Sequence, residues 1–313
     1  MGKDVHMSIY TITLNPAYDL HAYIEKFTPY CENLAYVQSR DAGGKGVNIS
    51  RALRTFGITN TAVIVLGNEN SGDYKTELQK LNMDCILIER QGCIRENLTI
   101  HCANAPETRI SFSGFEVDNR ILDEILEHLK LEPDSIVTFT GRIPEGIQVD
   151  AVKAFLNNIQ KQGVRIVLDS KSFSLKDIYE IKPWLIKPNQ EELSEYFGCR
   201  ISSIEEALDK ALEFAKNGVV NVMISLGEQG ALLVTDNQCF ASKPPSVQVE
   251  STIGAGDSSI AGFIAGTMQS KDPDKWLQLA TAFGSAACLT AGSKPPDKTA
   301  VEQICKQVRV CRL

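Results

Sequence analysis

The sequence has few of the residues that build metal centres or disulfide frameworks. It contains four histidines in 313 residues, and none of its nine cysteines stands in a C-x-x-C pair. An odd number of scattered cysteines, in a chain long enough to bury a sizeable core, also argues against a disulfide scaffold. We therefore expect no cysteine-rich metal site, and we expect thiols such as Cys85, in an apolar stretch, to be buried and reduced.

Long apolar runs and an excess of positive charge are absent too. No stretch approaches the ~20 apolar residues that a membrane helix needs, and residues 1–7 are too polar to be the core of a signal peptide. The net charge of −7 argues against general nucleic-acid binding, although it allows a local positive pocket for an anionic small molecule. We expect a cytoplasmic protein with neither a membrane nor a nucleic acid as its partner.

The sequence does contain a regular alternation of two patterns. Short, β-branched apolar runs are each followed by a longer stretch with helical spacing. This alternation predicts βαβ units and an α/β fold, with a doubly wound, mostly parallel sheet flanked by helices. The predicted strands are residues 8–14, 61–66, 135–139, 164–168 and 220–225, and the predicted helices are residues 47–56, 72–81, 119–129, 150–162, 204–217, 258–268 and 276–291.

Two regions interrupt this alternation. Residues 19–42 contain no clear helix, and residues 35–39 alternate like a strand. Residues 98–102 and 109–112 read as two further strands around a turn at Asn104-Ala105-Pro106. We expect a small β-sheet lid over an active site, with strands from about 19–42 and 95–113. The whole chain, residues 1–313, would otherwise form a single domain.

The strongest chemical signal is the glycine-rich segment 251–258, which reads S-T-I-G-A-G-D-S. Small residues let the backbone approach an anion, and the helix predicted to follow offers unpaired N–H groups and the positive end of its dipole. Asp257 is the only carboxylate of the segment, so it is the candidate base that takes a proton from an acceptor hydroxyl during phosphoryl transfer. The alternative is an ordinary turn with Asp257 as the helix N-cap.

A second segment suited to anions is 41–48, which reads D-A-G-G-K-G-V-N and opens the helix predicted at 47–56. It is not a P-loop, because its spacing differs and no Ser or Thr follows Lys45. The alternative for Lys45 is an exposed loop lysine. We expect Arg51 and Arg54, on the following helix, to be solvated surface charges.

A third segment, 184–193, runs from an apolar strand through Pro188 into a helix that begins near Asn189. Asn189 and Glu192 are three residues apart and can share one helix face. Their oxygens suit Mg²⁺ held through water. The same N-x-x-E spacing is also a capping box, and the local sequence favours that interpretation.

Three smaller features complete the set. Asp19 follows the first strand, where an open sheet places its ligands, and could accept hydrogen bonds from sugar hydroxyls; the alternative is a surface turn. Arg95 enters the lid and could bind a substrate phosphate, or else be an exposed arginine. Residues 225–230 read as a tight turn between strands, where Gly227 would let a nucleotide approach the backbone.

In this order, the segments resemble the PfkB carbohydrate kinases, a family with a ribokinase-like fold. They are most similar to its branch of 1-phosphofructokinases and tagatose-6-phosphate kinases. The resemblance rests on residues 13–19, 43–48, 187–193, 225–232 and 251–258, and it extends from about Tyr10 to Val308. The last segment is a family signature, and the lysine of G-G-K-G is typical of the phosphosugar branch. The resemblance implies a kinase that uses ATP and Mg²⁺.

The resemblance also implies roles for individual residues. Asp257 would be the base, with an anion hole formed by the backbone of Gly254, Ala255 and Gly256. The sugar phosphate would be bound by Asp19, Gly43, Gly44, Lys45 and Asn48, with Arg95 as its phosphate anchor. The nucleotide would lie against Lys187, Asn189, Ser225, Gly227, Gly230, Gly254, Gly256 and the region 282–287. Asn189 and Glu192 would join the magnesium network through water, and a homodimer would form through the lids.

The expected reaction is the phosphorylation of fructose 1-phosphate to fructose 1,6-bisphosphate by direct in-line transfer. Tagatose 6-phosphate and fructose 6-phosphate are the alternative substrates, because three positions depart from the branch. Arg142 replaces the serine of a Gly-Ser-Leu-Pro turn, Lys171 lies in a changed Asp-Thr-Ser-Gly segment, and Ser111 replaces a lid asparagine. A more remote alternative is a catalytically silent sugar-phosphate sensor on the same fold. A dinucleotide-binding dehydrogenase is disfavoured, because Asn15-Pro16 follows the first strand instead of G-x-G-x-x-G.

Overall fold

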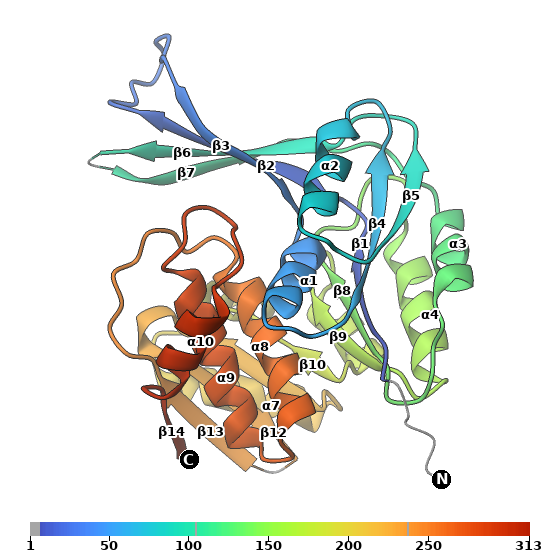
Figure 1. Ribbon diagram of the computed structural model, residues 1–313. Coiled ribbons are helices and arrows are strands. Elements are labelled where there is room, and N and C mark those ends of the chain that lie inside the picture. Colours follow the sequence, from blue (N-terminus) through green and yellow to red (C-terminus); the bar gives the residue numbers. More distant parts are fainter. Residues whose placement is uncertain (1–6, 104, 237) are drawn as a thin grey trace.

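The computed structural model describes residues 7–103, 105–236 and 238–313, so Asn104 of the predicted lid turn lies outside the described residues. A ten-stranded sheet has the order β14-β13-β12-β11-β10-β9-β8-β1-β4-β5 (Figure 1). Neighbours from β11 to β5 pair in parallel, and β12 to β14 add an antiparallel edge. The strands are β1 (Ile9–Thr13), β4 (Thr61–Gly67), β5 (Cys85–Arg90), β8 (Ile136–Thr140), β9 (Arg165–Asp169), β10 (Leu185–Ile186), β11 (Asn221–Ser225), β12 (Ala231–Thr235), β13 (Gln238–Lys243) and β14 (Arg309–Arg312).

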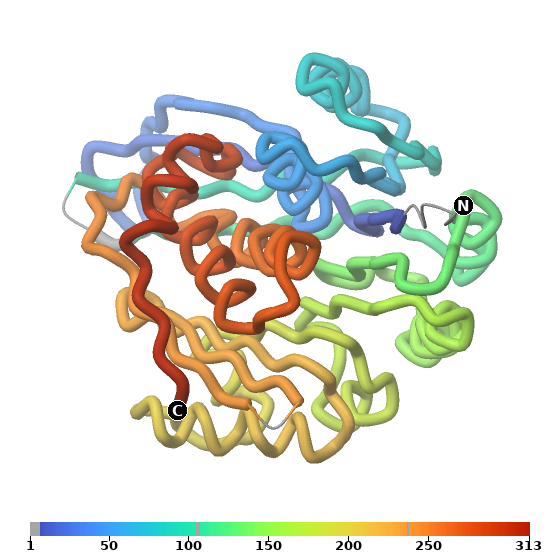
Figure 2. Tube along the Cα trace, turned by 60° about the horizontal axis from the view of Figure 1, so that its bottom comes forward, coloured from blue at the N-terminus to red at the C-terminus, as the bar shows by residue number. Residues whose placement is uncertain are grey.

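Helices cover both faces of this sheet, as the doubly wound prediction requires. One face carries α3 (Arg120–His128), α4 (Val149–Gln160), α5 (Leu175–Ile181), α6 (Gln190–Phe197) and α7 (Ile204–Lys216). The other carries α1 (Lys45–Thr55), α2 (Gly72–Lys80), α8 (Ala255–Gln269), α9 (Pro273–Ala287) and α10 (Lys298–Cys305). Figure 2 shows the strands of the β11–β13 end lying between α7 and the pair α8 and α9.

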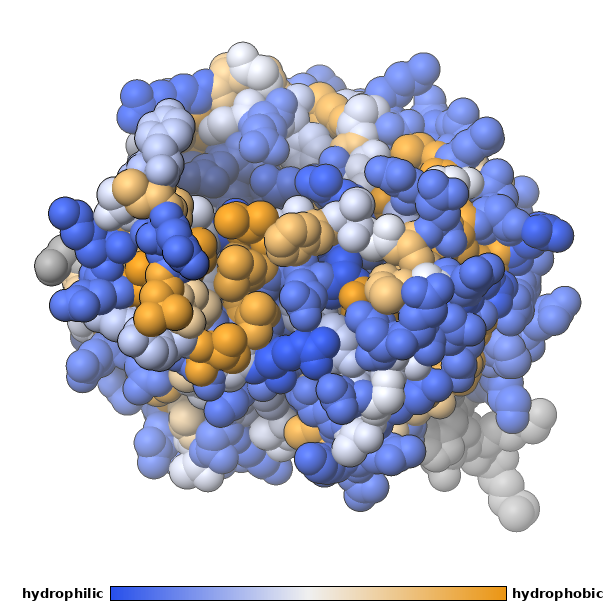
Figure 3. Space-filling view, turned by 90° about the horizontal axis from the view of Figure 1, so that it is seen from above, coloured by the Kyte–Doolittle hydropathy of each residue, from blue (hydrophilic) through white to orange (hydrophobic). Residues whose placement is uncertain are grey.

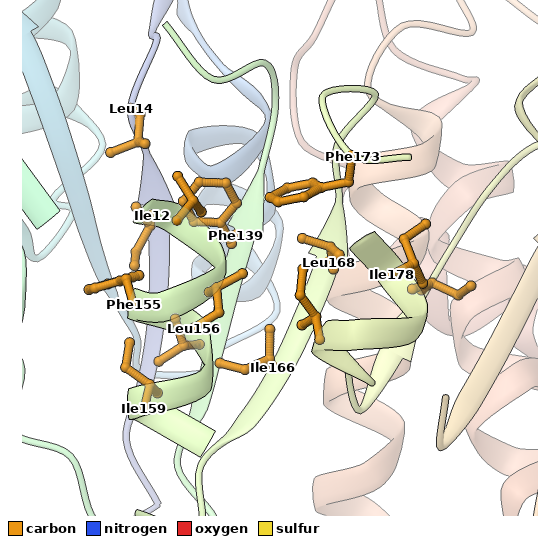
Figure 4. Close-up of a cluster of buried hydrophobic side chains, with 14 of the residues drawn as sticks. Ile12, Leu14, Phe139, Phe155, Leu156, Ile159, Ile166, Leu168, Phe173 and Ile178 are labelled. Atoms are coloured by element: carbon orange, nitrogen blue, oxygen red, sulfur yellow. The ribbon is translucent and has the colours of Figure 1, made fainter. Parts of the chain in front are cut away.

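The apolar strands are buried on both sides, which is why they read as near-continuous hydrophobic runs. In β9, Ile166 and Leu168 pack on the α4 and α5 side, while Val167 packs into the cluster that contains α8 and α9. Figure 4 shows side chains of β1, β8 and β9 converging with Phe155, Leu156 and Ile159 of α4. This double-sided core holds the carboxyl ends of the parallel strands in fixed positions.

The interrupted regions form a separate four-stranded sheet with the order β3-β2-β6-β7. Its strands are β2 (Ala17–Ile24), β3 (Tyr36–Gly43), β6 (Arg95–Cys102) and β7 (Ala105–Ser111). Figure 1 shows this small sheet projecting from the body beside α2. Its strands come from the two regions in which the sequence predicted lid strands.

The predicted strands and helices are confirmed to within a few residues at their ends. Two expectations about burial are wrong. Arg51 is buried, because α2 packs beside α1 and pairs the guanidinium with Glu77. Among the described residues, every cysteine is free and none is fully buried. Cys85 is only half-buried, because its strand β5 is the edge of the sheet. In the part of the chain that the structure describes, no helix has the length and apolar character of a membrane span.

Candidate active site

A cleft of about 730 Å³ opens at the carboxyl ends of the parallel strands, between the body and the small sheet. The start of α8, the loop before α1, the loop after β9 and the small sheet all contribute to its wall. Predicted site residues that line it are Asp19, Gly44, Lys45, Asn48, Arg95, Lys187, Asn189, Glu192, Gly254, Gly256 and Asp257. Segments far apart in the sequence therefore meet at one site.

The glycine-rich segment 251–258 forms the N-terminus of α8. Gly254 is the N-cap, with φ 77°, a conformation that favours glycine. No side chain caps the helix, and the Ala255 N–H donates to the Thr252 carbonyl at 3.3 Å, which leaves the N–H groups of Gly256 and Asp257 for a ligand. Asp257 lies within the first turn and is buried, so the alternative in which it serves as an ordinary N-cap is wrong.

The carboxylate of Asp257 is held in a defined position by α1. The Asn48 Nδ2 donates to Asp257 Oδ2 at 2.9 Å. Burial raises the pKa of Asp257 from 3.8 to about 6, while the nearby Lys45 opposes this rise. A carboxylate with such a pKa is ionised at neutral pH and is still basic enough to accept a proton.

Lysines and a second carboxylate surround Asp257. The Lys45 Nζ lies 2.9 Å from Asp169 Oδ2, at the carboxyl end of β9. Burial alone would lower the pKa of Lys45, but the charges of Asp169 and Asp257 hold that pKa above its ordinary value. Lys187 is also buried, and its Nζ lies close to α8: a Cβ added at Gly256 would be 3.0 Å from it. The lysines thus keep positive charge beside the first turn of α8.

Polar residues of the small sheet face the opposite part of the cleft. Asp19 is buried in β2, where its Oδ1 accepts hydrogen bonds from Asn97 Nδ2 at 2.9 Å and Arg109 Nη2 at 3.3 Å. The surface-turn alternative for Asp19 is therefore wrong. Arg95 donates to Asn97 Oδ1 at 2.9 Å. Burial lowers the pKa of Arg95, and the charges of Arg109 and Arg142 contribute in the same direction.

This cluster of arginines concentrates positive charge at the lid end of the cleft. Arg95, Arg109 and Arg142 all line its wall. The charges of Arg109 and Arg142 disfavour the charged form of Arg95, and an anion bound beside Arg95 would offset this effect. The arrangement is suited to a phosphate dianion.

Close packing explains the glycines before α1. A Cβ at Gly43 would lie 2.1 Å from Asp19 Oδ2, so only glycine leaves room for that carboxylate. Gly44, the N-cap of α1, has φ 127°. A larger residue at Gly43 or Gly44 would therefore disturb the backbone that places Lys45 in the cleft.

Asn189 and Glu192 form the capping box of α6. The Asn189 Oδ1 accepts from the Glu192 N–H at 2.8 Å, and Glu192 Oε2 accepts from the Asn189 N–H at 3.0 Å. Both residues also line the cleft, so the cap and the proposed ligand role coexist. The second oxygen of Glu192 lies 3.8 Å from Lys171 Nζ.

The remaining predicted nucleotide residues lie outside the cleft wall. Ser225 ends β11 and forms an isolated bridge with Asn189. Gly227 and Gly230 lie in the short turn before β12, with φ 60° and 102°, as the tight-turn prediction expected. In the region 282–287, Ala282, Phe283, Ala286 and Ala287 are buried in the core. Two residues predicted for other roles are also absent from the cleft wall. Ala255, of the predicted anion hole, is the first residue of α8, and Gly43, of the predicted sugar-phosphate site, packs behind Asp19.

The polar residues of the cleft that sequence reasoning missed include Asn97, Arg109 and Asp169. Asn97 and Arg109 belong to paired strands of the small sheet, and only that pairing brings them to Asp19. Asp169 ends a parallel strand, which is a position where ligand-binding residues gather, and this signal could have found it.

The family model for the pfkB family carbohydrate kinases matches residues 12–300. The chain belongs to the pfkB family of carbohydrate kinases. It is 31% identical to the 1-phosphofructokinase of Bacillus subtilis over 97% of this chain and 100% of that protein. It is 32% identical to the Escherichia coli (strain K12) 1-phosphofructokinase, with 88% and 89% covered.

Solved structures agree with this assignment to the pfkB family. The E. coli phosphofructokinase-2, crystallised with fructose-6-phosphate, superposes with a TM-score of 0.87 at 26% identity, and the match covers 96% of this chain and 99% of that one. The same E. coli protein has also been solved in a tetrameric inhibited form. These relatives confirm the ribokinase-like fold and a 1-phosphofructokinase-like sugar kinase, and sugar kinases of this family use ATP and a divalent metal.

The cleft fits a metal that arrives with the nucleotide better than one held by the protein alone. Among the described residues, no group of three or more His, Cys, Asp or Glu side chains could hold a metal ion. One oxygen of Glu192 and the Asn189 Oδ1 are already engaged in the capping box. The other oxygen of Glu192, which lies 3.8 Å from Lys171 Nζ, is the one that a metal-bound water could reach.

Proposed function

We propose that this chain transfers the γ-phosphoryl group of ATP to the free primary hydroxyl of fructose 1-phosphate. The observation that carries the proposal is the buried carboxylate of Asp257 in the first turn of α8, within a cleft lined by lysines and arginines. A base, an anion-binding helix terminus and a phosphate-binding cluster are the parts that phosphoryl transfer to a phosphosugar requires. Family membership supports this assignment.

In the proposed step, the acceptor oxygen bonds to the γ-phosphorus as the bond to the β,γ-bridging oxygen breaks. The hydroxyl proton passes to the carboxylate of Asp257, and ADP leaves. The Asn48 amide, which donates to Asp257 Oδ2, leaves the other carboxylate oxygen free for the hydroxyl. Transfer is direct, without a covalent intermediate. Holding the hydroxyl, Asp257 and the γ-phosphoryl group in line would lower the entropic part of the activation barrier.

Developing negative charge on the phosphoryl oxygens would be met by the N-terminus of α8 and the lysines. The backbone of Gly254, Ala255 and Gly256 would form the anion hole, with the Ala255 N–H leaving its 3.3 Å hydrogen bond to the Thr252 carbonyl. Lys45 and Lys187 add positive charge without reorganising, because both are already packed in place. A divalent metal would neutralise the ATP phosphates, with Asn189 and Glu192 contacting its water shell.

The nucleotide itself would lie along the β11–β12 turn. Ser225 is bridged to Asn189, and Gly227 is exposed with open space beside its backbone, whereas Gly230 is buried against the Ser242 carbonyl. We retain these residues, together with Lys187, as the proposed nucleotide site.

The substrate phosphate would bind between Arg95, Arg109 and Arg142. Asp19 would then accept hydrogen bonds from sugar hydroxyls between that phosphate and Asp257. In this arrangement Arg142, which replaces a serine of the branch, supplies a charge in place of a hydroxyl.

Fructose 6-phosphate and tagatose 6-phosphate are the second candidate substrates. The E. coli phosphofructokinase-2, whose structure contains fructose-6-phosphate, favours this alternative by its close superposition. The same residues would act, with the ketohexose reversed so that its C1 hydroxyl faces Asp257. A silent sensor is disfavoured, because the base and the complete glycine-rich segment are present.

The substrate assignment is tested by ADP release from MgATP with purified protein. The values of kcat/KM are compared for fructose 1-phosphate, fructose 6-phosphate and tagatose 6-phosphate. We expect a clear preference for fructose 1-phosphate. A preference for either 6-phosphate keeps the mechanism and reverses the sugar, whereas no turnover with any of the three overturns the proposed function.

Replacing Arg95 by alanine should raise KM for the phosphosugar by about 10–100-fold with a smaller change in kcat, because a charge-assisted contact to its phosphate is lost. The KM for ATP should change by less than about twofold. The matched control is Arg120→Ala, since Arg120 is an exposed residue of α3 outside the cleft. An unchanged KM for the phosphosugar in the Arg95 variant removes Arg95 from the anchor role.

We also propose a homodimer formed through the small sheet. Large apolar side chains are exposed in and beside it, at Phe27, Tyr30, Leu34, Tyr36, Val37, Ile110 and Phe112. Figure 3 shows apolar residues gathered on the half of the upper face where the small sheet lies. Such a patch is typical of a protein interface. Sedimentation equilibrium should give the mass of a dimer for the parent chain and of a monomer for the double variant Tyr36→Lys, Val37→Lys. A monomeric parent chain contradicts the proposal.

A further inference from the structure

One face of α2 touches the points where strands of the small sheet leave the body. Tyr74 and Glu77 are three residues apart in α2 and share one side of the helix, and Asn70 lies two residues before the helix begins. Together they form hydrogen bonds with the start of β2, the end of β3 and the residue before β6. We call these three residues the α2 clamp. Figure 1 shows α2 beside the roots of the small sheet.

The first contact holds the segment that enters β6. The Ile94 N–H donates to Asn70 Oδ1 at 2.7 Å, and Asn70 Nδ2 donates to the Ile94 carbonyl at 2.9 Å. One amide side chain thus pairs with both backbone groups of the same residue. The next residue is Arg95, so this pairing fixes the start of the strand that carries the proposed phosphate anchor.

The second contact holds the start of β2. The Tyr18 hydroxyl donates to the Asn70 carbonyl at 2.7 Å and accepts from the Tyr74 N–H at 3.0 Å. The rings of Tyr18 and Tyr74 meet edge to face with centroids 5.5 Å apart. Both side chains are fully buried, and Asp19 follows directly in the chain.

The third contact holds the end of β3, where the chain turns into Gly44 and Lys45. The Tyr74 hydroxyl donates to the Gly43 carbonyl at 2.6 Å. The Ala42 N–H donates to Glu77 Oε2 at 2.5 Å, and the other oxygen of Glu77 pairs with Arg51 of α1. These bonds satisfy buried backbone groups that the strand ladder leaves at its end.

The same helix is fixed to the body by apolar packing. Tyr74 and Leu78 pack with Ile64 and Leu66 of β4, in a cluster that also contains Tyr18, Ala42 and Ile94 from the lid roots. The clamp therefore joins a rigid strand of the main sheet to three of the four lid strands. None of its three residues lines the cleft.

We propose that the α2 clamp sets the position of the lid over the cleft, so that Asn70, Tyr74 and Glu77 are positioning residues for phosphosugar binding. Loss of a clamp contact would free one lid root without removing any group that touches substrate. The expected effect on KM for the phosphosugar rests on the proposed function. The expected effect on lid mobility does not, so an experiment can contradict one without contradicting the other.

Amide hydrogen exchange of the ligand-free protein tests the proposal. In Asn70→Ala, amide exchange in residues 17–24, 36–43 and 95–102 should become about tenfold faster, and in Tyr74→Phe the acceleration should be smaller. Each variant lacks a hydrogen bond that must break when the lid opens, so opening costs less free energy. Exchange in 136–140 and 165–169 of the main sheet should not change. The matched control is Thr76→Ala, since the exposed Thr76 hydroxyl bonds only to its own helix, at Gly72. Tyr74→Phe keeps the buried ring, so it serves if Asn70→Ala does not fold.

Two outcomes overturn the proposal: unchanged exchange in the lid strands, or equal acceleration in lid and main sheet, which would mean general destabilisation. With the phosphosugar of highest kcat/KM, both clamp variants should raise its KM by about tenfold, and the KM for ATP should change by less than twofold. Faster lid exchange with both KM values unchanged would show that the clamp does not position the sugar site. If no phosphosugar is turned over, the exchange result still decides the mechanical part.

Discussion

Replacing Asp257 by asparagine should lower kcat by about 10³–10⁴-fold while leaving KM for the phosphosugar within a fewfold. The amide keeps the shape and the neighbour Asn48, but it cannot accept the hydroxyl proton. Steady-state ADP release at pH 7.5 measures the effect. The control is Asp123→Asn, since Asp123 is an exposed residue of α3. Turnover of the Asp257 variant within tenfold of the parent would exclude Asp257 as the base.

The same variant should be more stable than the parent at neutral pH. Burial raises the folded-state pKa of Asp257 from 3.8 to about 6, so the ionised carboxylate is penalised in the folded protein. The penalty is absent below the unfolded value and complete above about pH 6, where it amounts to roughly 3 kcal/mol. We expect the melting temperature of Asp257→Asn at pH 7.5 to rise by about 5 °C. At pH 3, below the unfolded pKa, the two proteins should melt together.

Replacing Lys45 by methionine should lower kcat/KM by about 10²–10³-fold at pH 7, because the variant loses a fixed positive charge beside the transferred phosphoryl group. It should also change the pH dependence. The charge of Lys45 lowers the pKa of Asp257, which is about 6 in the parent protein. Removing that charge should therefore raise the pKa of Asp257. The base is then protonated at higher pH, and the variant should recover part of its activity between pH 7 and 9.

Profiles of kcat/KM against pH for the parent and Lys45→Met measure this shift. Lys176→Met is the control, since Lys176 is an exposed lysine on α5. A profile parallel to that of the parent would mean that Lys45 acts on the phosphate alone and not on Asp257. Normal activity at pH 7 would remove Lys45 from the site altogether.

Most of the main sheet could be predicted because its strands are buried on both faces and read as apolar runs. Strand β5 was missed although its residues 86–88 form an apolar run. Other missed elements lack that signal. Strands β13 and β14 lie at the antiparallel edge and are largely polar. Strand β2 carries the buried polar residues Asp19 and His21, so its alternation is hidden. Helix α5 was missed although Ser174 and Asp177 form a capping box that the sequence displays.

The candidate site could be predicted where one short segment carries the chemistry. Residues 254–257 and the loop before Lys45 are local signals, because glycines and a helix start belong together in sequence. The arginine cluster is different. Arg109 reaches Asp19 only through the pairing of β7 with β6 and of β6 with β2, and Arg142 approaches from the loop after β8. Long-range pairing of this kind leaves no mark in the local pattern.

The account depends most on Asp257 acting as a base in the folded cleft, and the pH profile of kcat/KM for fructose 1-phosphate tests this directly. Because the base must be ionised in the free enzyme, kcat/KM should fall about tenfold per pH unit below a pKa near 6. The substrate phosphate also titrates at about pH 6, so the Asp257→Asn variant should keep only the shallower limb that the substrate contributes. A parent profile no steeper than that of Asp257→Asn between pH 5 and 7, in protein that stays folded, would contradict the account.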